Sequence, residues 1–595
     1  MSHSPRIALA ATAAVALGVG AVACSPSSQD ANQASSKTDP SEDGGQEIAK
    51  DGHEVVADPV TEPVVGDAGA SSDGMVTKGR TPSGLAASKR FFDQADKVVI
   101  ALVSGDDGPG EAGAPREGVP TIEERAAMMA VQRKAPMLVL GQRPIEEYTK
   151  ELERLGAKTL VIVGGGEFDL PPEIRDGNWE LDTMLKPAGD GEAGEPAGEP
   201  GEAGGGGEGD KPADAPGDGA KPAGESGGAG EGDGAAAKPA GAKQELAERV
   251  AALGEGEPSI ATPVFASADS GVAAIATARA AGAQVHVLPS ADPRATKESS
   301  ELVQERSTIA LGAEFGSTDH YRSAAELAGR GEQPGGGELV FPGRRMIALY
   351  GHPSGGALGV LGKKSPEQAV AHVNDLVAQY QGVSDEPVIA AFEIIATVAA
   401  SQPGPNDLYT NVTDPADLVP YVDAITQAGG YAVLDLQPGR ANFLDQAKQY
   451  EELLKRPNVG LALDPEWHFD DGGKPLDRVG SVEAAQVNEV SEWLAGLVRD
   501  NNLPQKALVL HQFQLQMLRD REQIVTDHPE LAMVLHADGH GSAQKKFETW
   551  NAMRKGLDPR FFMAWKNFTK EDKPMFSPEQ TFQDVNPRPW FVSYQ

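Results

Sequence analysis

The chain has almost no cysteine and a shortage of basic residues, and both shortages limit what it can be. Cys24 is the only cysteine among 595 residues, so the chain cannot form an intramolecular disulfide. Lysine and arginine number 52 against 88 aspartates and glutamates, which gives a formal charge of -36. Proteins that bind nucleic acid usually present a basic face, and none is visible in this sequence. We therefore expect no nucleic-acid partner, in a chain long enough for several domains.

The first 24 residues lack a hydrophobic run long enough for a comfortable membrane span. Arg6 supplies a positive charge, and residues 7–22 are apolar and rich in alanine, as in a signal peptide. The run ends in Ala-Val-Ala-Cys24-Ser, which resembles the lipobox of bacterial lipoproteins. The resemblance implies cleavage before Cys24 and acyl chains such as palmitate on that residue. The protein would then be anchored at the extracytoplasmic face of the cell membrane. An ordinary secretory signal with a chance cysteine is the alternative.

Two segments have too few large apolar side chains to fold. Residues 25–85 are rich in Ser, Asp, Gly, Gln and Thr, and we interpret them as a flexible tether. Residues 187–243 contain no aromatic and no branched aliphatic residue, and 12 acidic against 4 basic residues give them a net charge of -8. We predict that this second segment is a disordered insert. It is either a tolerated loop expansion or a spacer.

Around the insert, apolar runs alternate with helix-like runs, which is typical of a parallel α/β sheet. The predicted strands are 97–103, 135–140, 158–163, 261–266, 284–288 and 308–311. The predicted helices are 121–133, 145–155, 270–281 and 299–306. We expect residues 86–330 to form one Rossmann-like, doubly wound α/β domain that the insert interrupts.

Part of this domain resembles a known repeat. Residues 134–140 read Lys-Ala-Pro-Met-Leu-Val-Leu, and residues 154–165 read Arg-Leu-Gly-Ala-Lys-Thr-Leu-Val-Ile-Val-Gly-Gly. Both are similar to the type 2 cell-wall-binding repeats of actinobacteria, which implies a cell-wall polymer as partner. The alternative is a generic Rossmann-like layer. A nucleotide site is not indicated, because the glycines at 164–166 form no G-x-G-x-x-G pattern.

The last third of the chain contains eight short apolar runs that each break into polar residues. The runs are 346–352, 388–393, 431–435, 459–467, 507–511, 531–538, 561–566 and 590–594. Helix-like sequence separates most of them, and eight strands in about 250 residues match a (β/α)8 barrel. We therefore predict an α/β chain with a linker at 331–343 and a TIM barrel at 344–595.

Carboxylates end several of these runs, which is where a TIM barrel carries its chemistry. Asp464 and Glu466 are two residues apart, so they share one face if the fourth strand continues that far. Glu393, Asp435 and Asp538 end three other runs. Carboxylates placed in this way can act as an acid and as a base or nucleophile, so all five are candidate catalytic residues.

Asp464-Pro-Glu466 resembles the Asp-x-Glu strand ending of chitinase-like and muramidase-like glycoside hydrolases. The resemblance implies that Glu466 is the acid and Asp464 its partner. The earlier acids of the chitinase motif are missing, since residues 460–463 read Gly-Leu-Ala-Leu. The seventh run also ends in lysine where many retaining enzymes have a second glutamate. The alternative is that both carboxylates make structural hydrogen bonds at the barrel rim.

Other polar or aromatic side chains near the strand ends are predicted to contact substrate. They are His352, Arg440, Trp467, His511, His536 and Lys566. For the two cations the alternative is ion pairing with barrel carboxylates. His511 and His536, on the fifth and sixth strands, resemble part of the ligand set of metal-dependent amidohydrolases. The set is incomplete, because the first strand gives His352-Pro where those enzymes have His-x-His, and the eighth strand ends without an aspartate. We therefore expect no metal and no cofactor, and metal-dependent amide or ester hydrolysis stays a weaker alternative.

As a whole, the barrel resembles the C-terminal region of actinobacterial lipoproteins with this layout. Leu349-Tyr-Gly-His-Pro353 and Leu463-Asp-Pro-Glu-Trp467 are among the residues that carry the resemblance. It implies no particular activity. The sequence thus predicts a membrane-anchored lipoprotein of the cell envelope, either a glycan-directed hydrolase or a non-catalytic protein that binds wall polysaccharide.

Overall fold

A computed structural model describes residues 54–56, 83–102, 120–184, 238–254, 258–470 and 472–595. The predicted signal peptide, Cys24 and residues 187–237 of the predicted insert lie outside the described residues. Two short pieces of the segments predicted to be unfolded have regular structure. Glu54–Val56 forms strand β1, and helix α5 covers Lys238–Ala251, so it includes the last six residues assigned to the insert.

The described part of residues 54–326 has two parallel four-stranded sheets, in line with the predicted parallel α/β structure. One sheet has the order β3-β2-β4-β5, and the other has the order β1-β8-β6-β7. Their strands are β1, β2 (Lys97–Ala101), β3 (Met137–Val139), β4 (Thr159–Val163), β5 (Glu180–Met184), β6 (Ile260–Ser267), β7 (Ala283–Leu288) and β8 (Ile309–Leu311). The sequence did not reveal β5, because an edge strand such as Glu-Leu-Asp-Thr-Met lacks the apolar run of a buried strand.

The helices in the described part of this region are α1 (Leu85–Phe91), α2 (Ile122–Arg133), α3 (Ile145–Leu155), α4 (Pro172–Arg175), α5, α6 (Val272–Ala280), α7 (Lys297–Glu305) and α8 (Thr318–Glu326). The four helices predicted in this region are present within one or two residues of their expected ends, as α2, α3, α6 and α7. Thr121 caps α2, because its hydroxyl accepts a hydrogen bond from the Glu124 amide at 3.1 Å while the Glu124 carboxylate accepts one from the Thr121 amide at 2.7 Å. Gly156 ends α3 with a φ of 66°, which suits a residue without a Cβ.

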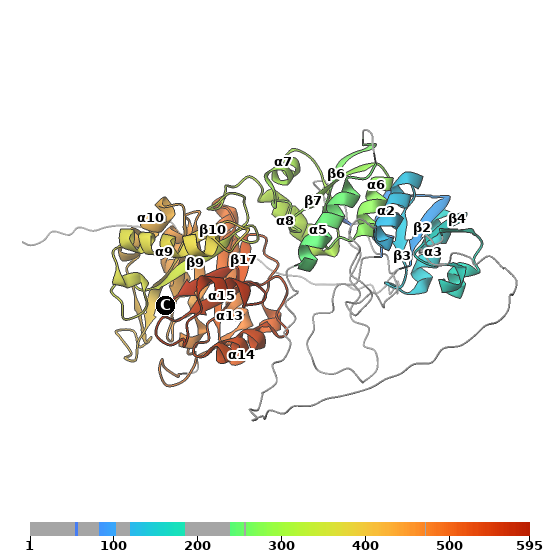
Figure 1. Ribbon diagram of the computed structural model, residues 1–595. Helices are drawn as coiled ribbons and strands as arrows, with labels where there is room; N and C mark the ends of the chain where they lie inside the picture. The colour runs from blue at the N-terminus through green and yellow to red at the C-terminus, as the bar shows by residue number, and fades with distance from the viewer. Residues whose placement is uncertain (1–53, 57–82, 103–119, 185–237, 255–257, 471) are drawn as a thin grey trace, which may run out of the picture. The chain divides into compact units, whose positions relative to one another are not determined.

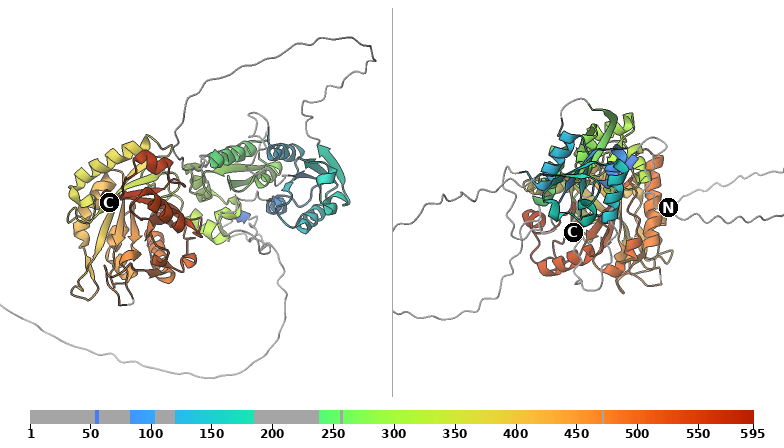
Figure 2. Two further views of the ribbon diagram at one scale, coloured as in Figure 1. Left: turned by 60° about the horizontal axis from the view of Figure 1, so that its bottom comes forward. Right: turned by 90° about the vertical axis from the view of Figure 1, so that its right-hand side faces the viewer.

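The predicted TIM barrel is confirmed: eight parallel strands close on themselves in the order β9-β10-β12-β13-β15-β17-β18-β19, and β9 pairs with β10 (Figures 1 and 2). The strands are β9 (Arg345–Gly351), β10 (Val388–Ala399), β12 (Tyr431–Leu436), β13 (Val459–Leu463), β15 (Lys506–Gln512), β17 (Leu531–Ala537), β18 (Phe562–Asn567) and β19 (Phe591–Tyr594). All eight predicted apolar runs therefore contain a barrel strand, as expected for strands that are buried on both faces.

Helices connect most neighbouring strands. They are α9 (Pro366–Gln381), α10 (Pro415–Gln427), α11 (Phe443–Gln449), α12 (Glu451–Leu454), α13 (Ala484–Asp500), α14 (Ala543–Arg554) and α15 (Pro578–Gln583). The connection from β15 to β17, all of whose residues are described, has no α-helix. It consists of two 3₁₀ turns and the short strand β16 (Leu518–Arg519), which pairs with β14 (Val482–Glu483).

Two predicted strand ends are in different places. Glu393 does not end its strand, because β10 continues for six more residues and its last part pairs with the antiparallel strand β11 (Thr410–Val412). In the fourth strand, β13 ends at Leu463 and residues 465–467 form a 3₁₀ turn, η4. Asp464 and Glu466 are thus not alternating residues of one strand. Pro465 has no amide hydrogen for the sheet, and the Asp464 carboxylate instead accepts the Glu466 amide.

The barrel has two apolar layers. The outer layer lies between strands and helices, and the inner layer fills the interior. The inner layer includes Val340 and Phe341, which precede β9 and belong to the predicted linker. The Phe341 ring packs against Phe562 and Trp590, at the starts of β18 and β19. Aromatic side chains therefore close the amino-terminal end of the barrel.

Candidate functional site

The same short pattern places the site residues at all the barrel strands: an inward-facing apolar residue is followed, two positions later, by an inward-facing polar residue. Alternate residues of a strand point to the same side, so the residue two positions after an inner apolar residue also points inward. Each strand, or in the case of β13 the residue directly after it, places a polar or phenolic side chain there, above the apolar layer. The pairs are Ala348–Tyr350, Ala391–Glu393, Val433–Asp435, Ala462–Asp464, Val509–His511, Val534–His536, Ala564–Lys566 and Phe591–Ser593. We call the second members of these pairs the polar layer.

His511 joins strands on opposite sides of the barrel. Its Nε2 lies 2.9 Å from Glu393 Oε1, and its Nδ1 lies 2.9 Å from Asp538 Oδ2. Because β12 and β13 separate β10 from β15, the bond to Glu393 has to cross the interior. Burial lowers the pKa of His511, but Glu393 and Asp538 outweigh it and hold this pKa well above its ordinary value. All three side chains are buried, so they form a desolvated ionic network.

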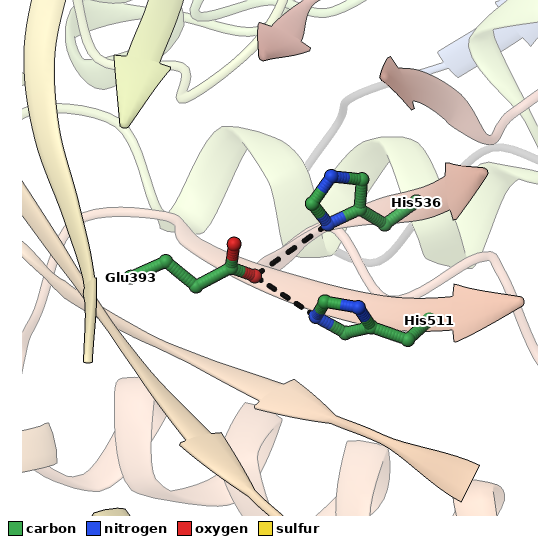
Figure 3. A group of neighbouring side chains, drawn as sticks. All are labelled: Glu393, His511 and His536. Atoms are coloured by element: carbon green, nitrogen blue, oxygen red, sulfur yellow. Dashed lines mark hydrogen bonds and ion pairs between the residues drawn. The ribbon is translucent and has the colours of Figure 1, made fainter. Parts of the chain in front are cut away.

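His536 faces the same carboxylate from the next strand. His511 and His536 are in register on β15 and β17, and their ring centroids are 4.6 Å apart. His536 Nδ1 lies 3.5 Å from Glu393 Oε1, beyond a normal hydrogen bond, while its Nε2 lies 3.1 Å from Ser593 Oγ. Burial lowers the pKa of His536, which favours the neutral ring. Figure 3 shows both imidazoles directed at the Glu393 carboxylate.

Asp435 and Tyr350 form a second contact within the polar layer. The Tyr350 hydroxyl donates to Asp435 Oδ2 at 2.8 Å and accepts from Gln437 Nε2 at 3.1 Å. Burial raises the pKa of Asp435 to about 6, although His511 acts in the opposite direction. Burial and the neighbouring Asp435 carboxylate raise the pKa of Tyr350 well above 10.0, so its hydroxyl remains a donor.

A cavity of about 430 Å³ opens above the polar layer, at the carboxyl ends of the strands. Its charged lining consists of Asp464, Glu466, Asp538, Lys566 and Glu571. Its other lining residues include Tyr350, Leu358, Gln437, Trp467, Leu476, Phe513, His540 and Phe568. Four predicted site residues do not line the cavity and are completely buried: Glu393, Asp435, His511 and His536. The predicted site residues thus separate into a group that faces the cavity and a buried group beneath it.

Glu466 is a carboxyl of this cavity that can hold a proton near neutral pH. Burial raises its pKa to about 7, and the charge of Asp538 adds to this effect while Lys566 opposes it. The turn η4 presents the residue, and Asp464 stabilises that turn by accepting the Glu466 amide at 3.2 Å. Burial raises the pKa of Asp464 well above 3.8. For Asp464, the alternative stated for both carboxylates therefore holds, because its carboxylate makes a structural hydrogen bond at the barrel rim.

Lys566 brings positive charge to the same cavity. Its Nζ lies 3.9 Å from Asp538 Oδ2 and 3.7 Å from the centre of the Tyr350 ring. Only 3% of its side chain is exposed, so the ammonium group is held in place by its surroundings. An acid, a carboxylate and an ammonium group are thus arranged around one small space.

Two of the predicted substrate contacts lie elsewhere. His352 shares hydrogen bonds with Ser354 and Thr413, and it is not part of the cavity lining. Arg440 donates to the carbonyls of residues 472 and 473 and to Asp407, and its guanidinium stacks on Tyr409. It therefore ties loops together away from the cavity and does not cap its carboxylates.

The sequence interpretation overlooked Tyr350, Gln437, His540 and Ser593. Tyr350 and Ser593 each lie two positions after an inward-facing apolar residue, as the predicted residues do, so this spacing would have identified them. Gln437 follows the end of β12 and gave no comparable signal. His540 lines the cavity with its ring against Phe568.

Comparisons with known proteins add little to this geometry. No protein-family model matches the sequence, and no curated protein matches it. Among solved structures, the chain is similar to a xylanase–α-amylase inhibitor protein crystallised in complex with trehalose. That match has 12% sequence identity and a TM-score of 0.27, and it covers 42% of this chain and 93% of the other. A likeness at this level carries no functional argument, so the chemistry rests on the site itself.

The described residues contain no helix with the length and apolar character needed to cross a membrane.

Proposed function

We propose that the barrel is a glycoside hydrolase that cleaves a polysaccharide of the cell envelope. The observation that carries the proposal is that Glu466 and Asp538 line one cavity at the carboxyl ends of the barrel strands, with a cation beside them. A pair of carboxyl groups, one able to donate a proton and one able to accept it, is the usual equipment for hydrolysing a glycosidic bond.

In this proposal Glu466 is the general acid. It donates its proton to the glycosidic oxygen while the bond between that oxygen and the anomeric carbon breaks. A pKa raised to about 7 keeps the proton on Glu466 in neutral surroundings and makes its transfer easy. Asp464 positions the acid through the amide of the turn.

Asp538 is the base in the same step. Its Oδ2 is held by His511, whereas its Oδ1 is buried without a hydrogen-bond partner among the described residues. The Asp538 carboxylate, which lines the cavity, accepts a proton from water as the water oxygen bonds to the anomeric carbon. The proton lost by Glu466 and the proton gained by Asp538 balance the hydrolysis.

The remaining lining suits a sugar. Lys566, Gln437 and Tyr350 supply polar groups for hydroxyls, while Trp467 and Phe513 supply flat apolar faces for the sugar ring. The cavity volume of about 430 Å³ lies within the usual range for small-molecule sites, so it accommodates a short stretch of polymer.

The proposed location rests on the sequence. A lipid on Cys24 and a tether would hold the barrel at the extracytoplasmic face of the membrane, and the region 86–330 would bind wall polymer. Replacing Cys24 by alanine should move the protein from the membrane fraction to the soluble fraction. Retention of the 86–330 fragment on purified cell walls tests the second part, and a freely eluting fragment would remove it.

The activity is tested by incubating the purified chain with cell-wall glycans and measuring new reducing ends. Glu466→Gln should lower the rate by about 10²–10⁴-fold, the usual contribution of a general acid. Glu571→Gln is the matched control, because Glu571 lines the same cavity but is exposed. Equal rates for wild type and Glu466→Gln would contradict the proposal. Retention on glycan without any new reducing ends would favour the non-catalytic binding protein.

A further inference from the structure

The polar layer holds three metal-binding side chains at one point beneath the cavity. A carboxylate oxygen of Glu393, an imidazole nitrogen of His511 and one of His536 all lie within 4.8 Å of one another (Figure 3). We propose that this point is a structural site for a divalent transition-metal ion. The proposed ligand atoms are Glu393 Oε1, His511 Nε2, His536 Nδ1 and Asp435 Oδ1.

The separations of Glu393 Oε1 from the two imidazole nitrogens fit a coordination shell. Ligand atoms about 2.0–2.1 Å from a tetrahedral Zn²⁺ ion are about 3.3 Å from one another. Glu393 Oε1 lies 2.9 Å from His511 Nε2 and 3.5 Å from His536 Nδ1. Asp435 Oδ1 lies 3.8 Å from His511 Nε2. The first two distances lie on either side of the expected value. Asp435 lies outside the group of three side chains and has to move by at least about half an ångström to become the fourth ligand.

Hydrogen bonds to neighbouring side chains orient three of the proposed ligands toward the metal position. The Nδ1 of His511 is held by Asp538, and the Nε2 of His536 is held by Ser593. Each imidazole thus has its second nitrogen engaged and its first directed at Glu393. The Tyr350 hydroxyl likewise occupies Oδ2 of Asp435 and leaves Oδ1 for the ion. Metal-binding histidines and carboxylates are typically oriented by such outer contacts.

Several atoms at this point are buried without a hydrogen-bond partner in the described part of the chain. They are Glu393 Oε2, Asp435 Oδ1 and His536 Nδ1. Buried polar atoms normally have hydrogen-bond partners, so three unpaired atoms around the proposed metal position need an explanation. A bound cation satisfies Asp435 Oδ1 and His536 Nδ1 directly, and its charge stabilises the whole Glu393 carboxylate.

Two carboxylates and two neutral imidazoles carry a charge of -2, which a divalent ion balances. Without an ion, a proton on His511 Nε2 bridges to Glu393, and metal binding releases this proton. Two nitrogens and two oxygens suit Zn²⁺ and its neighbours in the first transition row better than Ca²⁺ or Mg²⁺.

The ion would have a structural role, because all four ligands are buried and none lines the cavity. A site closed by four protein ligands leaves no position for substrate. The ligands come from β10, β12, β15 and β17, so the ion would connect both sides of the barrel. The inference does not depend on the proposed hydrolysis.

The test uses the full chain, dialysed against a chelator and then titrated with Zn²⁺. We expect about one Zn²⁺ per chain by elemental analysis after gel filtration, and a rise in the thermal unfolding temperature. Cobalt in place of zinc should give visible absorption bands that report nitrogen ligands. Ser593→Ala removes only an outer contact, and it should weaken the affinity by about 10–100-fold.

His511→Gln and His536→Gln should lose the ion, and His352→Gln should keep it. His352 is a suitable control because it also follows a barrel strand, and its imidazole hydrogen-bonds to Ser354 and Thr413 instead of the cluster. Retention of the ion by both cluster variants would mean surface binding and would overturn the proposal. If those variants do not fold, the wild-type cobalt spectrum decides: a folded chain without bound metal or cobalt bands excludes the site.

Discussion

Replacing Glu466 by glutamine should alter how the stability of the barrel depends on pH. Burial, helped by Asp538, raises the pKa of Glu466 from 4.5 to about 7 in the folded chain. The folded chain therefore keeps this proton over a range of pH in which the unfolded chain has already lost it. A group that is protonated longer in the native state makes the free energy of unfolding fall as pH rises through that range.

The size of the effect follows from the two pKa values. A difference of about 2.5 pKa units corresponds to about 3 kcal/mol, because each unit is worth about 1.4 kcal/mol. The wild-type chain loses most of this contribution to its free energy of unfolding between about pH 5 and about pH 8. The contribution is lost completely only above the pKa that Glu466 has in the folded chain. Glutamine has a similar shape and cannot ionise. Glu466→Gln should therefore be more stable than wild type by about 3 kcal/mol at about pH 8 and by less than about 1 kcal/mol at about pH 5.

Denaturant unfolding followed by tryptophan fluorescence measures this difference. Five of the six tryptophans lie in residues 344–595, so the signal reports mainly on the barrel. Glu571→Gln, at an exposed residue of the same cavity lining, is the matched control. A stability difference between wild type and Glu466→Gln that is the same at both pH values would refute the reasoning, whether or not the protein is an enzyme.

Three further changes have expected outcomes. Asp538→Asn should lower kcat for glycan hydrolysis by about 10²–10⁴-fold, because asparagine cannot accept the proton of water; an unchanged kcat would exclude Asp538 as the base. Lys546→Met should destabilise the barrel by about 3–5 kcal/mol in denaturant unfolding, because it leaves the buried Asp572 carboxylate without its ion-pair partner. The double variant Lys546→Met/Asp572→Leu should recover only part of that loss, because Asp572 also accepts hydrogen bonds from the Gly541 and Phe568 amides. No recovery at all would assign the effect to packing. Thr121→Ala removes the cap of α2 and should cost about 1 kcal/mol, measured by urea unfolding of the region that contains the helix.

The barrel could be predicted because its strands are buried on both faces. Such strands appear in the sequence as continuous apolar runs, and all eight runs were found in this way. Strand ends were harder to place. Glu393 was assigned to a strand end, yet β10 continues to Ala399 because β11 pairs with its last residues. Pairing with a distant three-residue strand leaves no signal near Glu393 itself.

The grouping of the site residues was less predictable than their identity. His511 contacts Glu393, which lies 118 residues earlier in the chain, and no local pattern indicates that the two side chains meet across the barrel. The sequence placed Asp464 and Glu466 ahead of Asp435 and Asp538, but it gave no sign of which carboxylates would share a cavity. The structure separates them, because Asp435 lies beneath the cavity and Glu466 lines it. Burial of this kind depends on the closed barrel, and a single sequence does not contain it.

The polar layer belongs to the strands, whereas much of the cavity wall belongs to the segments that follow them. Leu358, Leu476, Phe513 and Phe568 lie outside the barrel strands, and the β15–β17 connection has no helix that would fix its length. Loop exchange at residues 513–530 should therefore leave the buried ionic network intact while it reshapes the entrance above. Because the polar layer and the cavity wall belong to different segments, ligand preference can be engineered by grafting loops onto this barrel without redesign of the core.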